Sequence, residues 1–163
     1  MTFSNPVKSA LYASIAGFLT FVLPIHAATQ TTTFQVTATV QATCTISATA
    51  LAFGTYSGAT LNATSSVSVT CTNTTPYNVG LNAGLASGAT VTTRQMQNGS
   101  VLLNYALYSN AGMTTNWGNT SGSWVGGTGN GSLQTLTVYG QVASGQYVTP
   151  GSYADTITAT VNY

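Results

Sequence analysis

Side chains that could carry acid–base or nucleophilic chemistry are few in this sequence. Besides the tyrosines and two cysteines, the ionisable residues are Lys8, Arg94, Asp155 and one histidine, His26. Paired-carboxylate catalysis needs two carboxylates, and a Ser-His-Asp or Cys-His arrangement needs a histidine. The chain has one acidic residue, and its only histidine lies near the N-terminus. The sequence therefore predicts no catalytic residue and a protein that is not an enzyme.

The two cysteines, Cys44 and Cys71, are the remaining candidates for chemistry. As metal ligands they would need histidine or carboxylate partners to complete a site, and the chain has almost none. We therefore expect neither a metal nor a cofactor. In an oxidising compartment the two thiols are free to pair, and we expect a disulfide that stabilises the fold by about 3 to 4 kcal/mol.

Residues 1–27 have the features of a secretory signal peptide. Lys8 supplies a weakly positive start, and residues 10–23 form an uncharged apolar stretch that is short for a membrane span. We expect cleavage after Ala27 or Ala28, which leaves about 135 residues, the size of one domain. The alternative is a retained membrane anchor. After cleavage we expect no insertion into the membrane.

Charge excludes some partners for the remaining chain, which carries only Arg94 and Asp155 as its cation and anion. Nucleic acid and anionic lipid are bound by clusters of Lys and Arg, so we expect no nucleic-acid partner. A net charge near zero also removes the repulsion that keeps soluble proteins apart. This composition favours self-association.

The residue pattern predicts an all-β fold. Thr, Ser, Gly, Asn, Ala and Val dominate, and apolar and polar residues alternate in short runs between Gly or Asn turns. Strict alternation from residue 31 to 46 predicts one strand, or two in line, with one buried face. The pattern predicts strands at 31–46, 50–56, 65–71, 77–82, 91–96, 101–108, 133–142 and 152–163. Eight short strands with turn-rich spacers are typical of a sandwich.

Turn and loop signals complete this interpretation. Asn98-Gly99 predicts a type I′ hairpin between two of the strands. Residues 111–131 are rich in Gly, Asn, Thr and Ser and contain Trp117 and Trp124, so they predict a long surface loop. The two tryptophans are either buried under this loop or exposed for a partner or a sugar. We expect Asp155, near the start of the last strand, to accept main-chain N–H groups.

A set of short motifs resembles a known family. The motifs are Cys44, Leu51-Ala52-Phe53-Gly54, Ser68-Val69-Thr70-Cys71, Tyr105-Ala106-Leu107-Tyr108, Trp117-Gly118, Tyr139-Gly140, Pro150-Gly151-Ser152-Tyr153-Ala154-Asp155 and Thr158-Ala159-Thr160-Val161-Asn162-Tyr163. Their order along the chain is similar to that of the spore coat protein U domain family, which includes subunits of archaic chaperone–usher pili.

This resemblance implies an incomplete immunoglobulin-like β-sandwich that lacks its last strand. A periplasmic chaperone would hold such a subunit, an outer-membrane usher would assemble it, and the N-terminal strand of the next subunit would complete it by donor-strand exchange. In that reading residues 28–42 are the donor strand and residues 43–163 the sandwich. The sequence agrees, because its last predicted strand runs to the final residue and its first alternating segment has no evident partner. The donor side chains are Phe34, Val36, Ala38 and Val40.

The sequence thus favours a structural subunit of a secreted surface fibre that supports adhesion and biofilm formation. Its partners would be identical or related subunits, a chaperone and an usher, and its location the cell surface, reached through the periplasm. One alternative is a spore or cell-coat protein that self-associates without an ordered pilus. Another is a secreted carbohydrate-binding module with a sugar platform of Trp117, Trp124 and Tyr108.

Overall fold

The computed structural model describes residues 24–163, and all the regular structure in this part of the chain is β-strand. The chain divides into two units, Met1–Ala38 and Thr39–Tyr163, and the second carries all eight strands. Residues 24–38 form neither helix nor strand. Most of the predicted signal peptide lies outside the described residues. Between residues 24 and 163 no helix is long and apolar enough to cross a membrane.

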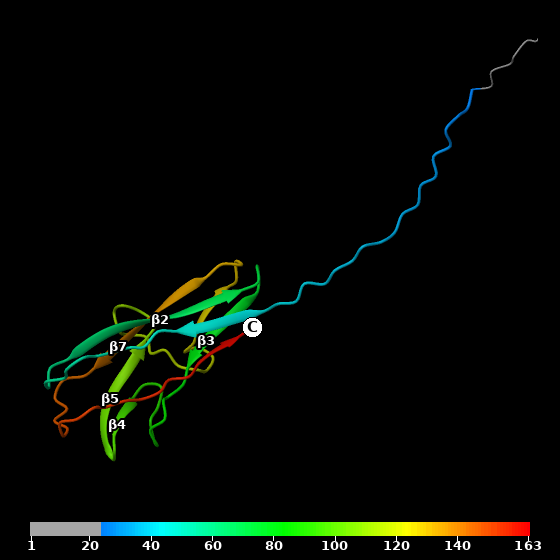
Figure 1. Cartoon of the computed structure of the whole chain (residues 1–163). Helices are drawn as coiled ribbons and strands as arrows, with labels where there is room; N and C mark the ends of the chain where they lie inside the picture. Colours follow the sequence, from blue (N-terminus) through cyan, green and yellow to red (C-terminus); the bar gives the residue numbers. More distant parts are fainter. Residues whose placement is uncertain (1–23) are drawn as a thin grey trace, which may run out of the picture. The chain divides into compact units, whose positions relative to one another are not determined.

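Two antiparallel sheets form the second unit (Figure 1). One sheet has the order β1-β2-β7-β5-β4 and the other the order β6-β3-β8. This arrangement confirms the all-β sandwich expected from the sequence. The strands are β1 (Cys44–Ala48), β2 (Leu61–Cys71), β3 (Pro76–Leu81), β4 (Arg94–Asn98), β5 (Val101–Tyr108), β6 (Val125–Thr128), β7 (Gln134–Val142) and β8 (Ala159–Asn162).

A core of β-branched, leucine and aromatic side chains fills the space between the sheets. Alternate residues of β2, β5 and β7 point inward, as the period of two along a strand requires. Trp117 has no exposed surface, and its indole Nε1 donates to the carbonyl of Val79 at 2.8 Å. The predicted surface loop 111–131 is therefore pinned to the core by Trp117, and it contains the short strand β6.

Two of the predicted strands are shorter than their sequence pattern. Of residues 31–46, only the part from Cys44 onward is a strand, and of residues 152–163 only β8 is. Residues 50–56 form no strand. The alternating pattern marks one buried face, whereas a strand also needs a neighbouring chain for its hydrogen bonds. Residues 31–42 and 50–56 have no such neighbour in the described chain, and of residues 152–157 only Ala154 pairs, with Gln97.

The predicted hairpin at Asn98-Gly99 is present, but its turn type differs. Asn98 pairs with Val101, so the two central residues are Gly99 and Ser100. Gly99 has φ of +61°, and Ser100 is not among the residues with positive φ. This corresponds to a type II′ turn, which needs glycine only at its first central position, instead of the predicted type I′ turn.

Candidate functional site

A groove opens between two extended segments at the side of the sandwich. Two cavities of about 760 and 410 Å³ lie along it, and both are lined by Leu51, Phe53, Met96 and Tyr153. One wall is the segment that follows β1, and the other is the segment that leads into β8. Because the cavities share these residues, we treat them as one groove.

Both walls of the groove carry unpaired main chain. Within the described residues, the N–H and C=O groups of residues 50–57 make no hydrogen bond to another part of the chain. In the opposite wall the same is true of Tyr153, Asp155 and Ile157. Alternate residues of that wall bond away from the groove: Ala154 pairs with Gln97 in both directions, at 2.8 and 3.1 Å. The groove thus has two free strand edges facing each other.

The first wall is seated on β7 through Leu51 and Phe53. Gly140 makes room for them, since a Cβ at this position would lie 2.8 Å from Leu51 Cδ1 and 2.9 Å from Phe53 Cζ. The Phe53 ring also meets the Tyr105 ring edge to face, with centroids 5.9 Å apart. These contacts hold the wall in place without main-chain hydrogen bonds.

Asp155 fixes the second wall. Its carboxylate accepts the N–H of Leu85 at 2.9 Å, the N–H of Thr156 at 2.7 Å and the hydroxyl of Tyr105 at 2.7 Å. Gly84 allows this approach, because a Cβ there would overlap the carboxylate and because its φ of +91° suits glycine. Asp155 does accept main-chain N–H groups, as the sequence predicted.

Arg94 lies beside this network and has no exposed surface. Its guanidinium donates to four main-chain carbonyls, those of Leu81, Asn82, Val91 and Trp117, at 2.6 to 3.0 Å. Burial lowers the pKa of Arg94 to about 10, partly offset by the nearby Tyr105 and Asp155. Burial also raises the pKa of the Tyr105 hydroxyl, and its hydrogen bond to Asp155 raises it further. The arginine ties the end of β3 to the loop that contains Trp117.

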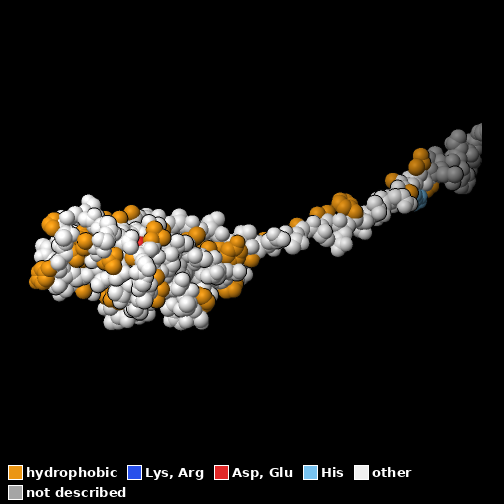
Figure 2. Space-filling model, turned by 90° about the horizontal axis from the view of Figure 1, so that it is seen from below, with side chains coloured by type: hydrophobic (Ala, Val, Ile, Leu, Met, Phe, Trp, Pro, Cys, Tyr) orange, Lys and Arg blue, Asp and Glu red, His pale blue; other side chains and the backbone are white. Residues whose placement is uncertain are grey.

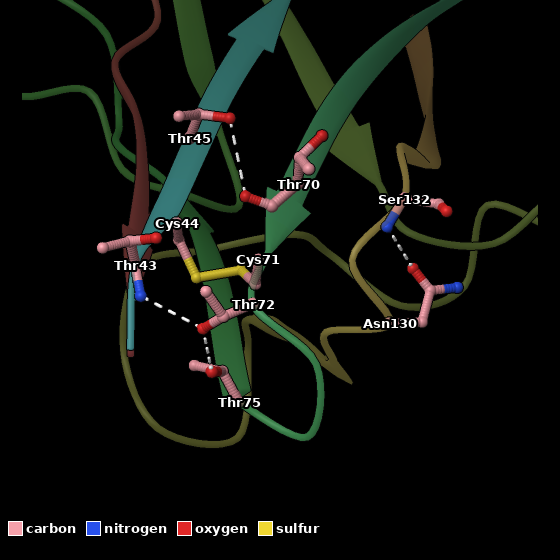
Figure 3. Close-up of a disulfide and its surroundings, with 9 residues drawn as sticks. All are labelled: Thr43, Cys44, Thr45, Thr70, Cys71, Thr72, Thr75, Asn130 and Ser132. Carbon is pink, nitrogen blue, oxygen red and sulfur yellow. Dashed lines mark hydrogen bonds between the residues drawn. A yellow bond between two sulfur atoms is a disulfide. The ribbon is translucent and has the colours of Figure 1, made fainter. Parts of the chain in front are cut away.

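A disulfide joins Cys44 and Cys71, as expected (Figure 3). The two residues are the first pair in the register of β1 with β2. Around them, Thr72 Oγ1 accepts the N–H of Thr43 at 3.2 Å and bonds Thr75 Oγ1 at 2.6 Å. Figure 3 shows these side chains clustered at one end of the sandwich. The start of β1 is therefore held covalently to β2.

The structure leaves the predicted donor side chains in solvent. Phe34, Val36 and Val40 are 85%, 81% and 87% exposed, and Ala38 is exposed too. The predicted sugar platform is not formed, because Trp117 is fully buried and Trp124 and Tyr108 are half-buried. The sequence pattern predicted strands over both walls but not that they face each other across a groove. The apolar residues at every second position, Leu51 and Phe53 in one wall and Tyr153 and Ile157 in the other, were a usable signal for it.

Comparisons with known proteins agree with this architecture. The model of the Spore Coat Protein U domain family matches residues 30–160. Protein U of Myxococcus xanthus is 36% identical over 178 aligned positions, which cover 98% of this chain and 99% of that protein.

Among solved structures, the chain resembles one from the CsuC–CsuE chaperone–tip adhesion subunit pre-assembly complex of archaic chaperone–usher Csu pili of Acinetobacter baumannii. The TM-score is 0.58 at 25% identity, and the match covers 77% of this chain and 41% of that one. The matched family and this neighbour consist of structural proteins rather than enzymes. Since the family model matches most of its length, the chain belongs to the Spore Coat Protein U domain family.

Proposed function

We propose that this protein is a structural subunit of a surface fibre of the archaic chaperone–usher type, assembled by donor-strand exchange. The observation that carries the proposal is the groove between two walls of unpaired main chain. A strand inserted there pairs with residues 50–57 on one side and with Tyr153, Asp155 and Ile157 on the other. It thereby satisfies two free edges at once, each main-chain hydrogen bond contributing about 0.5 to 1.5 kcal/mol.

The occupant of the groove is the N-terminal segment of another copy. Phe34, Val36, Ala38 and Val40 alternate with Gln35, Thr37 and Thr39, so one face of this segment is apolar. The groove is lined by apolar residues such as Leu51, Phe53 and Met96. Burying Phe34, Val36 and Val40 stabilises the joint by about 1.5 to 3 kcal/mol each before the cost of association.

The direction of insertion follows from the ends of the strands. β1 begins at Cys44, opposite Cys71 at the end of β2, and β3, which follows closely, has Asn78 near its start paired with Asn162 of β8. The chain before β1 therefore enters the sandwich at the end where β8 finishes. A donor that runs antiparallel to residues 153–159 places its own sandwich beyond Tyr153, at the opposite end. Each subunit then uses different ends for giving and receiving a strand, and the contact repeats without closing, as in a fibre. A donor parallel to residues 153–159 would place its own sandwich at the end where β8 finishes. The acceptor's own N-terminal segment leaves from that same end, so the two would compete for space.

Export and assembly need helper proteins. The solved neighbour comes from a chaperone–subunit pre-assembly complex, which supports a periplasmic chaperone that covers the groove before assembly. We further propose an outer-membrane usher, cleavage of residues 1–27, and a fibre at the cell surface that supports adhesion and biofilm formation.

The test compares charges placed on the two faces of the donor segment. Val36→Asp and Val40→Asp should abolish fibres while leaving export intact, because a carboxylate would be buried unpaired in the groove. Gln35→Asp and Thr37→Asp are the matched controls and should assemble normally, since their side chains remain in water. The readout is the ladder of polymers in unheated surface extracts on a denaturing gel, with heated samples for total subunit. Equal assembly by both sets would contradict donor-strand exchange.

A second function is favoured by one observation, the match of residues 30–160 to the model of the Spore Coat Protein U domain family, whose description names a spore coat. In this alternative the same groove and tail join subunits into a spore or cell coat without an ordered pilus. Electron microscopy of the cell surface, with and without the protein, separates a coat layer from filaments.

A further inference from the structure

The structure also points to a single register for the inserted strand, an inference that rests on the proposed donor-strand exchange. The wall that leads into β8 alternates along its whole length. Tyr153, Asp155, Ile157 and Ala159 are half-buried, and the three residues between them are exposed. This wall therefore offers four inward positions. The apolar face of the donor segment has the same number, two residues apart: Phe34, Val36, Ala38 and Val40.

One end of the groove is closed. From Ala159 onward the wall is β8, which lies against β1, and the cavities have no lining residue beyond Ala159 on this wall. At the other end the groove stays open, past Tyr153 toward Val148 and Tyr147. An antiparallel donor therefore advances until Phe34 reaches Ala159. It has no space to move one step further, opposite Val161.

We propose that the donor strand seats with Ala38 opposite Asp155. The other opposed pairs are then Phe34 with Ala159, Val36 with Ile157 and Val40 with Tyr153. In each of these pairs the two residue numbers sum to 193, as antiparallel pairing requires. In a register shifted by one inward position, every donor residue would lie opposite a wall residue two positions away.

The sizes of the side chains favour this register. The largest donor residue, Phe34, meets the smallest wall residue, Ala159. The smallest donor residue, Ala38, meets Asp155, whose carboxylate already accepts three hydrogen bonds and needs nothing from the incoming strand. A shift toward the open end would place Val36 against this carboxylate and Val40 opposite Gly151, where there is no side chain to pack on. The hydrogen-bonded carboxylate of Asp155 thus favours the register in which the small Ala38 lies opposite it.

Outward-facing residues provide a test that leaves the groove untouched. In this register Thr37 lies directly opposite Thr156, and both side chains face solvent. The main-chain groups of Thr156 do not point into the groove, so the two residues form a non-hydrogen-bonded pair, with Cα atoms about 4.5 Å apart. That is within disulfide range. Residues one step away in register, Ala154 and Thr158, lie at a diagonal distance of about 7 to 8 Å, which is too far for a disulfide.

The experiment uses fibres of the full chain with Thr37→Cys combined with Thr156→Cys, and two matched controls with Thr37→Cys combined with Ala154→Cys or Thr158→Cys. After mild oxidation, heated non-reducing gels measure covalent polymer, and mass spectrometry of chymotryptic peptides identifies the linked residues. We expect most of the subunit to be cross-linked in the Thr156 variant and background levels in both controls.

Each other outcome has a definite meaning. Preferential linkage of Thr37→Cys to Ala154→Cys or Thr158→Cys, or equal linkage to all three, would overturn the single register while leaving donor-strand exchange intact. Fibres that form normally in all three variants without any cross-link would count against donor-strand exchange itself.

Discussion

At the scale of single residues, both charges of the described sandwich support its architecture. Arg94 holds four carbonyls from three separate segments, and Asp155 anchors the wall of the groove to the residues that follow β3. Each group has its hydrogen-bond partners, which is the condition under which a buried charge is tolerated. The two residues are near each other, but each has its own hydrogen-bond partners.

Arg94→Lys should therefore be strongly destabilising although it conserves the charge. An ammonium has three donors and lacks the planar fork that reaches carbonyls on both sides, so at least one buried carbonyl loses its partner. We expect the free energy of unfolding to fall by about 2 to 4 kcal/mol. Urea unfolding of a subunit carrying a second copy of residues 31–42 after Tyr163 measures this value. Thr92→Lys, at an exposed position nearby, is the control and should change it by less than about 0.5 kcal/mol.

At the scale of elements, the groove depends on how closely its first wall approaches β7 at Gly140. Gly140→Ala and Gly140→Val should progressively push Leu51 and Phe53 into the groove, because the new Cβ meets both side chains at under 3 Å. Polymer ladders should weaken in the order Gly, Ala, Val, while the subunit still folds with its disulfide formed. Gly112→Ala, in a loop where a Cβ would come within 3.3 Å of the Asn110 amide only, is the control. Full assembly of Gly140→Val would argue against a groove-seated strand.

Sequence patterns predicted the strands that have neighbours on both sides. β2, β5 and β7 lie close to their predicted bounds, because alternation reports a buried face and each has a pairing partner. The same alternation over residues 31–43 and 152–158 did not produce strands, because a pattern of burial does not specify which chain supplies the hydrogen bonds. The buried Arg94 was not predictable, since arginine is normally exposed and its four acceptors come together only in the folded chain.

At the scale of the whole molecule, the sandwich presents a nearly uncharged surface. Figure 2 shows scattered apolar side chains and a single small acidic spot on one face of the sandwich, with no Lys or Arg side chain visible there. Beyond residue 27, Arg94 is the only Lys or Arg in the chain. Two subunits with such surfaces attract or repel each other very little through charge. The specificity of assembly must then come from strand pairing and shape.

This composition makes trypsin a probe of folding, since residues 28–163 contain one cleavage site, after Arg94. Arg94 is fully buried in a strand paired with β5, so cleavage requires the sandwich to open. We expect assembled fibres to resist trypsin, while heat-unfolded subunit is cut into two fragments. A subunit without chaperone or partner strand should be cut at least about tenfold faster than fibres, because its groove is empty and it opens more often. The heat-unfolded subunit, in which Arg94 is accessible, is the control for the activity of the protease. Equal trypsin cleavage rates for fibre and lone subunit would show that strand insertion does not stabilise the sandwich.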